Sequence, residues 1–313
     1  MTRSSANPMT EVMPRPKVRN NVRSWTRSSV RPYVMIAPAI LVFSLFFIYP
    51  IGYMIYLSVL DWNFVSPVKD FIGLANFKGL FQEQKFLEVM KNTFMYTTLT
   101  VSLTIVISLL ISLWLNKQGK VYAFVQGALF SPHIISLVSI SMLWMWLMDS
   151  NYGLLNWFLN LFGISNVPWL TSPSTSLLSL VIVAVWKGIG FNALIFIAGL
   201  QSIPKDIYEA AELDGTSKVR TFFKITLPML SPTLFFLTII GIINSFQVFE
   251  TIAIMTQGGP LNSTNTFVFY IYEYSFRFFK IGFASAAGVV LLVIISLMTI
   301  VYFNILSRRV HYQ

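Results

Sequence analysis

The stretch that organises this chain reads Glu209-Ala210-Ala211-Glu212-Leu213-Asp214-Gly215 and, nine residues later, Ile225-Thr226-Leu227-Pro228. Residues 202–224 hold four acidic and four basic side chains, whereas strongly apolar runs precede and follow them. A mixed-charge segment most often marks a solvated face. The simplest interpretation is therefore a hydrated loop between two membrane spans.

Local chemistry predicts that this loop folds into two short helices with a sharp turn. Pro204 suits a first helical position, where its missing N–H costs nothing, and the pair Ala210–Ala211 combines helix propensity with small side chains. Gly215 can adopt the left-handed conformation that ends a helix. Either Thr216 or Ser217 can cap a second helix.

Composition identifies the rest of the chain as membrane-embedded. Of 313 residues, 55% are hydrophobic and 11% are charged, and the mean hydropathy is +0.68. Soluble domains carry about 25% charged residues. Six apolar runs exceed the roughly 20 residues needed to cross a bilayer. We therefore predict an all-α integral membrane protein with six transmembrane helices, at residues 33–60, 93–115, 121–148, 174–200, 229–256 and 281–306.

The predicted organisation is one membrane domain with a polar tail at each end. Residues 1–32 are rich in Arg, Pro, Ser and Asn without an apolar period, so we expect a disordered basic tail. The first apolar run is too long for a signal-peptide core of roughly 7–15 residues. We therefore expect a retained membrane domain over 33–306, which includes the loop 201–228, and a short tail over 307–313.

The distribution of Lys and Arg predicts the orientation. The N-terminal tail holds seven of the 22, residues 117–120 hold two, the loop 201–228 holds four and the C-terminus holds two. The loops on the opposite side hold six, and Lys187 lies within a span. The positive-inside rule then places both termini and the loop 201–228 in the cytoplasm. The basic tail suits anionic lipid better than nucleic acid.

The spacing in the loop resembles the cytoplasmic signature loop of the membrane subunits of bacterial binding-protein-dependent ABC importers. Residues 201–204 and 222–228 narrow this resemblance to sugar permeases, and within these the chain looks like the maltose-type first permease and the glycerol-phosphate permease. Residues 71–77, Asn92-Thr93 and Gly258-Gly259-Pro260 resemble further family strings. Thr216, where the family often has Ala, is a departure that leaves the turn intact.

The resemblance implies a type I importer permease fold in which the loop is a coupling helix that docks on an ATPase subunit. The coupling residues that it implies are Glu209, Ala210, Ala211, Asp214, Gly215, Ile225, Leu227 and Pro228. It also implies a heterodimer with a second homologous permease, two ATPase subunits that bind ATP and Mg²⁺, and an extracellular solute-binding protein. The implied location is the plasma membrane of a bacterium or an archaeon.

Two charged residues fall inside predicted spans, Lys187 in the fourth and Glu250 in the fifth. A central Lys costs about 2.5–3.5 kcal/mol on the insertion scale, so it should face protein or water. It could pair with Glu250, meet an anionic substrate, or serve packing alone. A lone histidine such as His133 is more often a packed, hydrogen-bonded group than a proton relay.

The fifth span carries the candidate substrate face. Gly241, Asn244, Ser245 and Val248 share one side of a helix, which suits either ordinary helix packing or a solute path. In the resembled family the matching part of this helix lines the translocation path. We therefore predict a path that includes Gly241, Asn244, Ser245, Gln247, Val248 and Asn192, with Phe246 and Phe249 as apolar neighbours.

Several chemistries lack their motifs. The chain has no P-loop, no Gly-x-Ser-x-Gly and no His-Glu-x-x-His, so we expect a non-catalytic subunit whose ATP is hydrolysed by a partner. No cysteine and only two histidines argue against a metal centre. An ion-coupled secondary transporter remains the alternative, although it usually has repeated halves and intramembrane acids. The solute stays open among disaccharides, oligosaccharides, other sugar derivatives and glycerol phosphate.

Overall fold

The computed structural model describes residues 22–306, so most of the predicted N-terminal tail and the predicted C-terminal tail lie outside the described residues. The chain divides into two compact units, Met1–Tyr53 and Met54–Gln313, and each is considered by itself. The second unit holds the loop 201–228 and the predicted substrate path.

The first unit is a long helix that continues into the second. It comprises α1 (Val22–Phe43), the π-helical turn η1 (Ser44–Ile48) and the start of α2 (Tyr49–Ser58). The segment 32–58, which extends beyond Tyr53 to the end of α2, is long and apolar enough to span a membrane. Helix α1 begins at Val22, within the segment expected to be a polar tail, and no Gly or Pro occurs between Val22 and Pro32.

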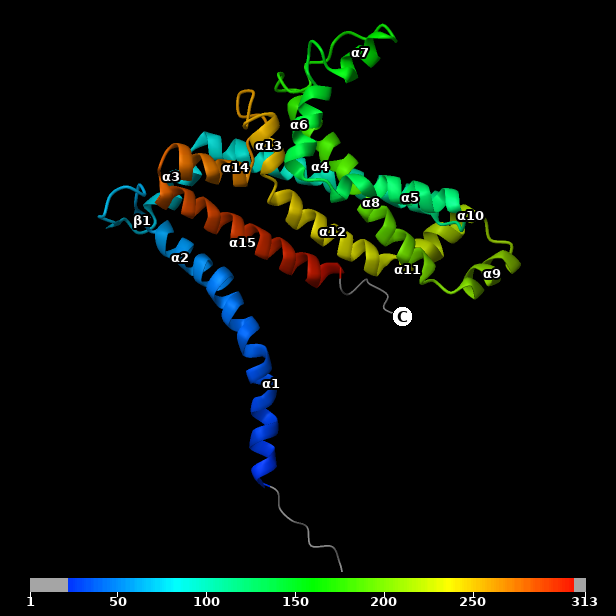
Figure 1. Cartoon of the computed structure of the whole chain (residues 1–313), viewed down its shortest axis with the longest axis horizontal. Coiled ribbons are helices and arrows are strands. Elements are labelled where there is room, and N and C mark those ends of the chain that lie inside the picture. The colour runs from blue at the N-terminus through cyan, green and yellow to red at the C-terminus, as the bar shows by residue number, and fades with distance from the viewer. Residues whose placement is uncertain (1–21, 307–313) are drawn as a thin grey trace, which may run out of the picture. The chain divides into compact units, whose positions relative to one another are not determined.

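The second unit supplies the remaining candidate spans (Figure 1). Two helices separated by a short break and bent by 99° form one of them, and with this pair taken as a single span the described residues provide six. The six predicted membrane helices are thereby confirmed. The helices concerned are α4 (Gln84–Leu115), the pair α5 (Lys120–Ile134) and α6 (Leu137–Leu147), α8 (Ser176–Gln201), α12 (Ser231–Phe246) with α13 (Glu250–Met255), and α15 (Ile281–Leu306).

Short elements connect the spans. Two strands pair antiparallel, with Leu60 opposite Phe71 and Asp61 opposite Asp70. The connecting elements are β1 (Leu60–Asp61), β2 (Asp70–Phe71), α3 (Ala75–Gln82), α7 (Leu154–Asn160), α9 (Lys205–Leu213), α10 (Lys218–Thr221), η2 (Phe222–Thr226), α11 (Leu227–Met229), α14 (Phe267–Tyr272) and η3 (Glu273–Arg277).

Two helix boundaries differ from the sequence prediction. Helix α4 begins at Gln84 rather than near residue 93, because its charged first turns also carry Phe86 and Val89, which are fully buried. The predicted fifth span is broken after Phe246, and Phe249 has φ −139° and ψ −59° before α13 begins. The helical face predicted to run to Val248 therefore ends one turn earlier.

Helix α8 is the central element of the second unit, because it packs along both α4 and α5. One apolar cluster joins α8 to α4, α6, α13 and α14, and a second joins α4, α12, α14 and α15 to α3. A hydrogen bond from the Ser108 hydroxyl of α4 to the Ile189 carbonyl of α8, 3.1 Å long, adds a polar contact within this packing. Helix α4 therefore takes part in both apolar clusters, and α8 packs against α4 and α5.

Two strings noted in the sequence meet at one end of the bundle. Asn92 of α4 donates its amide to the carbonyls of Asn262 and Asn265, at 2.8 and 3.2 Å. The neighbouring Thr93 hydroxyl accepts from the N–H of Phe267 at 3.1 Å. The loop that starts with Gly258-Gly259-Pro260 is therefore held directly by α4.

The carboxylate of Glu83, which lies between α3 and α4, anchors α14 and η3 at the same end. Glu83 accepts hydrogen bonds from the hydroxyls of Tyr270 and Tyr274. Burial, reinforced by the nearby carboxylate, raises the pKa of both phenols above the ordinary tyrosine value, so both remain protonated donors. Glu273 binds Lys85 at 3.0 Å and Arg277 at 3.6 Å. The bonds made by Glu83 and Lys85 join segments about 190 residues apart in sequence.

We expect Glu83→Ala to lower the thermal stability of the protein markedly. The substitution leaves the hydroxyls of Tyr270 and Tyr274 without their acceptor, and each orphaned buried polar group costs about 1–3 kcal/mol. Both tyrosines are buried. The midpoint of thermal loss of the monodisperse peak in size-exclusion chromatography measures the change. Glu88→Ala, at an exposed position in the second turn of α4, is the control, and equal midpoints for the two variants would contradict the prediction.

Candidate functional site

The loop 201–228 has the helix–turn–helix form predicted from its sequence. Helix α9 ends at Leu213, and Gly215 adopts φ +67°. The N–H of Gly215 donates to the Glu212 carbonyl and the N–H of Thr216 donates to the Ala211 carbonyl, both at 3.0 Å. This pair of bonds is the Schellman motif, which satisfies the last helical carbonyls and fixes the turn.

The second half of the loop resolves the two capping alternatives. Ser217 caps α10, and its side chain accepts from the N–H of Arg220 at 3.4 Å. Pro204 lies immediately before α9, with φ −57° and ψ 135°, and is the N-cap rather than the first helical residue. The chain then passes through η2 into α11, which contains Leu227 and Pro228.

One side of the loop packs against the helices that flank it, and the other side is exposed. Ile203 of the loop is buried against Leu200 and Leu230, and Tyr208 packs on this cluster. Within the loop, the Tyr208 and Thr226 hydroxyls lie 3.2 Å apart, and Ala211 is buried. Glu209 and Leu213 face outward, and the Leu213 side chain is 89% exposed. A hollow of about 420 Å³ on the loop is lined by Asp206, Ile207, Ala210, Ala211, Asp214, Thr216 and Ile225. Four of the predicted coupling residues therefore share one surface depression.

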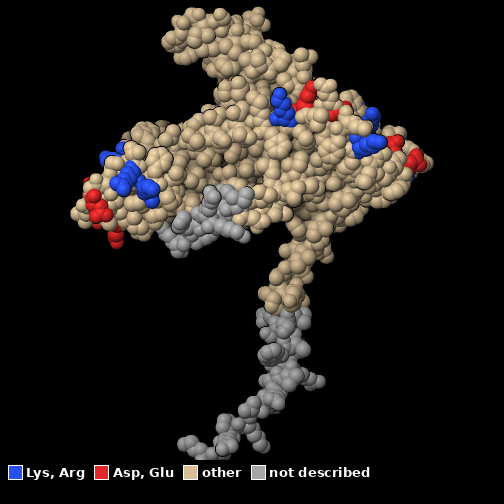
Figure 2. Space-filling view, turned by 180° about the vertical axis from the view of Figure 1, so that it is seen from behind, with Lys and Arg blue, Asp and Glu red and all other residues tan. Residues whose placement is uncertain are grey.

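Charged side chains of the described residues gather where this loop lies. In the space-filling view, Lys, Arg, Asp and Glu side chains cluster at one end of the helical body. Much of the surface between this end and the other charged side chains is uncharged (Figure 2). Strands β1 and β2 and helix α3 lie at the other end of the second unit (Figure 1). The arrangement suits a bundle whose two polar ends face different aqueous phases.

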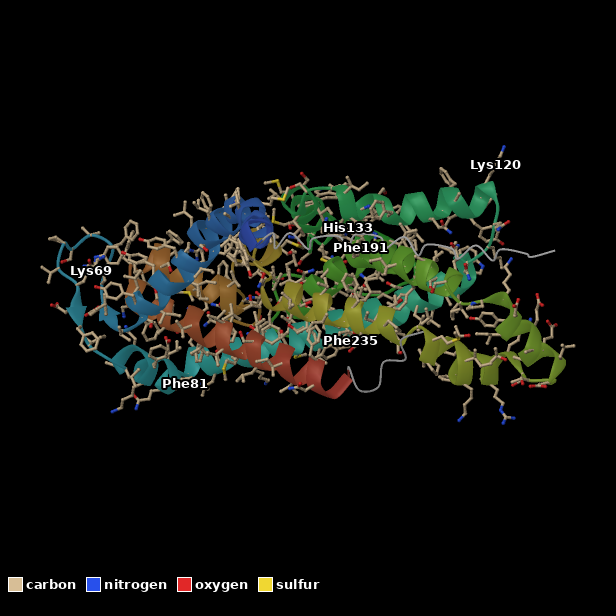
Figure 3. The ribbon with its side chains drawn as sticks, turned by 90° about the horizontal axis from the view of Figure 1, so that it is seen from below. Lys69, Phe81, Lys120, His133, Phe191 and Phe235 are labelled. Carbon is tan, nitrogen blue, oxygen red and sulfur yellow. The ribbon has the colours of Figure 1, made fainter. Side chains whose placement is uncertain are left out.

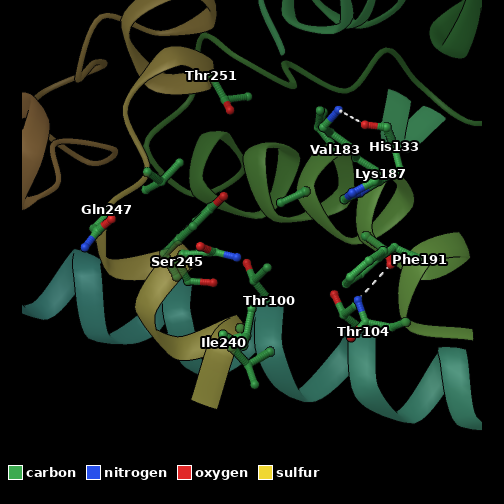
Figure 4. Close-up of a pocket in the computed structure, with 18 of the residues that line it drawn as sticks. Thr100, Thr104, His133, Val183, Lys187, Phe191, Ile240, Ser245, Gln247 and Thr251 are labelled. Carbon is green, nitrogen blue, oxygen red and sulfur yellow. Dashed lines mark hydrogen bonds between the residues drawn. The ribbon is translucent and has the colours of Figure 1, made fainter. Parts of the chain in front are cut away.

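A pocket of about 410 Å³ lies inside the second unit (Figure 4). Its walls come from α4, α5, α6, α8, α12 and the break before α13. All of the residues predicted for the substrate path line it, and both intramembrane charges do so as well. These residues are Asn192, Gly241, Asn244, Ser245, Gln247, Val248, Lys187 and Glu250. The structure brings them together, and their contact with a solute remains a prediction.

The pocket combines apolar walls with uncharged hydrogen-bonding groups. Asn244 and Gln247 are exposed, whereas the Asn192 amide donates to the Gly188 carbonyl at 2.8 Å and keeps its oxygen free for other donors. Hydroxyl and amide groups among apolar side chains are what a polyhydroxylated ligand requires. The arrangement can therefore hydrogen-bond a sugar-like molecule.

Sequence reasoning missed the contribution of α4 to this pocket. Thr100 and Thr104 line it, opposite α8 and α12. The available signal was a row of small polar side chains at helical spacing along α4, all buried in the structure: Thr93, Thr97, Thr100, Thr104, Ser108 and Ser112. One face of a membrane helix that carries such a row must point toward protein rather than lipid.

Lys187 has partners that the sequence did not reveal. Its Nζ donates to the carbonyls of Pro132, His133 and Ile135, at 3.1, 3.2 and 2.7 Å. The ion pairs among residues 22–306 join Lys85 and Arg277 to Glu273, so Lys187 does not pair with Glu250. The cation is held by the end of α5.

Two aromatic predictions have different outcomes. The His133 ring stacks on Phe191, with centroids 4.5 Å apart and planes 12° apart, near the middle of the helical body (Figure 3). Phe246, expected beside the solute path, is fully buried and packs edge-on against Phe94 at 5.2 Å instead. Phe249 packs against Tyr272 and Phe269. Neither Phe246 nor Phe249 is among the residues that line the pocket.

No cluster of three or more His, Asp or Glu side chains that could hold a metal ion occurs within residues 22–306.

Glu250 lies at the start of α13 and is exposed at the pocket. An acid in the first turn of a helix interacts favourably with the helix dipole. This carboxylate therefore remains available to accept hydrogen bonds.

Comparison with known proteins identifies relatives along nearly the whole chain. The model of the family described as "Binding-protein-dependent transport system inner membrane component" matches residues 109–312. The sn-glycerol-3-phosphate transport system permease protein UgpA of Pectobacterium atrosepticum is 32% identical over 92% of this chain and 97% of its own length. The probable ABC transporter permease protein YesP of Bacillus subtilis is 35% identical over 93% and 95%.

A solute-specific relative and a solved structure extend this picture. The sulfoquinovosyl glycerol transport system permease protein SmoG of Agrobacterium fabrum is 32% identical over 91% of this chain and 94% of its own. The crystal structure of a bacterial ABC transporter involved in the import of the acidic polysaccharide alginate has a similar chain, with a TM-score of 0.76 and 28% identity. The match covers 90% of this chain and 99% of that one.

Proposed function

Because the chain belongs to the family of binding-protein-dependent transport system inner membrane components, we propose that it forms half of the path by which a sugar or sugar derivative enters a bacterial cell. Family membership makes the chain a multi-pass permease subunit of an importer of this kind. Three of the four proteins compared above are named for their solutes, which are sn-glycerol-3-phosphate, sulfoquinovosyl glycerol and alginate. The same solute chemistry suits a pocket of amides and hydroxyls.

The observation that carries the proposal is that one chain contains both a polar pocket within its spans and a structured loop that can couple to an ATPase. The pocket within the spans gathers the predicted path residues, and the loop 201–228 presents a rigid, capped helix with outward-facing Glu209 and Leu213. In this proposal the loop docks on an ATPase subunit, and the movement of that subunit turns the pocket from one side of the membrane to the other. No observation favours the ion-coupled alternative.

The proposed assembly contains a second homologous permease, two ATPase subunits that bind ATP and Mg²⁺, and a solute-binding protein. A bacterial alginate transporter solved with an alginate pentasaccharide-bound periplasmic protein supports the last of these, because its chain superposes with a TM-score of 0.79 and is 25% identical. The Lys and Arg distribution supports both termini and the loop 201–228 in the cytoplasm. The relatives compared above that name an organism come from bacteria, and no observation favours an archaeal host.

The test is a gentle detergent purification from native membranes through a C-terminal tag, with every co-purifying chain identified by mass spectrometry. We expect a second six-span permease and a P-loop ATPase in stoichiometric amounts. A binding protein that accompanies them is then screened against neutral and acidic saccharides by a thermal-shift assay. Recovery of this chain alone, under several detergents that keep other importers intact, would contradict the proposed assembly.

A further inference from the structure

We propose that Lys187 is a positioning residue: its ammonium latches the bent third span onto α8 and so sets the shape of the pocket, without binding the solute itself. The consequence for the solute path depends on the proposed function. The latch itself depends only on the contacts between α5, α6 and α8.

The C-terminal end of α5 lies where backbone groups lack partners. The last four carbonyls of a helix have no intrahelical donor, and Pro132 removes one more N–H from the final turn. The Ala128 carbonyl, which that N–H would have served, accepts from the Ser131 hydroxyl at 2.9 Å instead. Ile135 is extended, with φ −72° and ψ 142°, so the chain leaves the helix and bends by 99° into α6.

A bend of this kind inside a membrane needs donors from elsewhere in the protein. Lipid offers no hydrogen bonds, so broken helices persist only where protein or a water-filled cavity satisfies the freed carbonyls. Lys187 does this from α8, with three carbonyls of the bend at 2.7–3.2 Å from its Nζ. A positive charge also interacts favourably with the C-terminal end of a helix dipole. The partly buried charge of Lys187 and the unsatisfied carbonyls of the broken helix thus compensate each other.

These contacts leave Lys187 with no donor for an anionic solute. An ammonium group carries three N–H donors and no acceptor, and three carbonyls accept from it. A solute phosphate or carboxylate would have to displace one of these carbonyls and leave it unsatisfied. Glu250 also lines the pocket, but within residues 22–306 it forms no ion pair with Lys187, so it does not hold the ammonium.

The bend decides the shape of the pocket because both of its sides contribute to the wall. His133, from α5, and Leu137, from α6, both line the pocket. On the α5 side, the His133 ring is stacked on Phe191 of α8. On the α6 side, Trp144 packs edge-on against Trp186 of α8 at 5.4 Å. Release of the latch would allow α6 to move relative to α5, and the two walls would separate.

The experiment uses the absence of cysteine from the chain, which lets two spin labels be placed without background from this chain; a sample without introduced cysteines corrects for labelling of the partner subunits. Phe124→Cys on α5 and Trp146→Cys on α6 are exposed positions on either side of the bend. Val106→Cys on α4 and Val293→Cys on α15 form a control pair that does not include it. Pulsed electron–electron distances are measured on the full chain purified with its partner subunits in lipid nanodiscs.

We expect a single narrow α5–α6 distance distribution in the parent protein and a broadened or shifted one after Lys187→Met. The control pair stays unchanged, which separates loss of the latch from general destabilisation. Glu250→Gln leaves both distributions as in the parent. If Lys187→Met does not assemble, Lys187→Gln, which keeps two N–H donors without the charge, is measured in its place and should also broaden or shift the α5–α6 distribution.

An unchanged α5–α6 distribution in Lys187→Met, or in Lys187→Gln where that variant replaces it, overturns the latch, and loss of solute uptake alongside it would indicate direct solute contact instead. A broadened distribution in Glu250→Gln would also overturn it, in favour of an ion pair. The distance measurement requires no transport. Failure of the latch and failure of the proposed import function are therefore separate results.

Discussion

Gly190→Ala is expected to prevent α8 from docking on α5, with a large loss of folded protein. A β-carbon at this position would lie 1.8 Å from the carbonyl oxygen of Leu129, 2.4 Å from its carbonyl carbon and 2.8 Å from the backbone nitrogen of Phe130. Ordinary carbon–oxygen contacts are about 3.3–3.6 Å. Helix α5 would have to move away by about 1.5 Å, because the obstacle is backbone and cannot rotate aside.

The displacement would also break the contacts around Lys187. Gly190 and Lys187 are three residues apart and therefore share one face of α8, and the Lys187 hydrogen bonds to α5 are already 2.7–3.2 Å long. We expect a destabilisation at or above the upper end of the roughly 1–3 kcal/mol typical of overpacked cores. A loss of that size lowers the thermal midpoint by roughly 5–10 °C.

Two glycine variants calibrate this measurement by size-exclusion chromatography after heating. Gly127→Ala, in α5, meets nothing within 4 Å, so it should be neutral or slightly stabilising, because Ala favours a helix by about 1 kcal/mol over Gly. Gly188→Ala would approach the Thr104 methyl group to 3.2 Å, and a side chain can adjust, so its effect should be intermediate. A wild-type midpoint for Gly190→Ala would show that the two backbones are further apart than described.

Gly215→Pro is expected to abolish solute uptake while leaving membrane insertion intact. Proline fixes φ near −65°, whereas residue 215 has φ +67° and donates its N–H to the Glu212 carbonyl. The substitution therefore removes a hydrogen bond and forbids the turn, at a cost of a few kcal/mol confined to the loop. Gly215→Asn is the control, because Asn tolerates the left-handed conformation and should retain most of the uptake.

Glu209→Lys should have the same consequence through charge rather than shape. The Glu209 side chain is exposed on α9, so its reversal leaves the fold intact and places a positive charge where the proposed ATPase socket meets the loop. Uptake is measured in cells that lack the native gene, and insertion is measured as the amount of the chain in the membrane fraction. Normal uptake by Gly215→Pro or by Glu209→Lys would contradict the coupling role of this loop.

The sequence alone predicted those properties that depend on residues close to one another along the chain. Hydropathy located the spans, because burial in lipid requires a continuous apolar run whatever the helix contacts. The turn at Gly215 followed from the one residue type that takes a positive φ without strain, and the structure has it there at +67°. The residues predicted for the substrate path line one pocket, because polar groups within spans must face protein or water.

The tertiary structure decided what depends on which helices meet. Lys187 could have paired with Glu250, but its partners are the orphan carbonyls of α5, a choice set by the bend between α5 and α6. The break after Phe246 and the early start of α4 likewise depend on packing: Phe86 is buried against Phe267 and Tyr270, more than 180 residues away in sequence. A one-dimensional pattern records that a group needs a partner, and only the packed helices determine which partner is within reach.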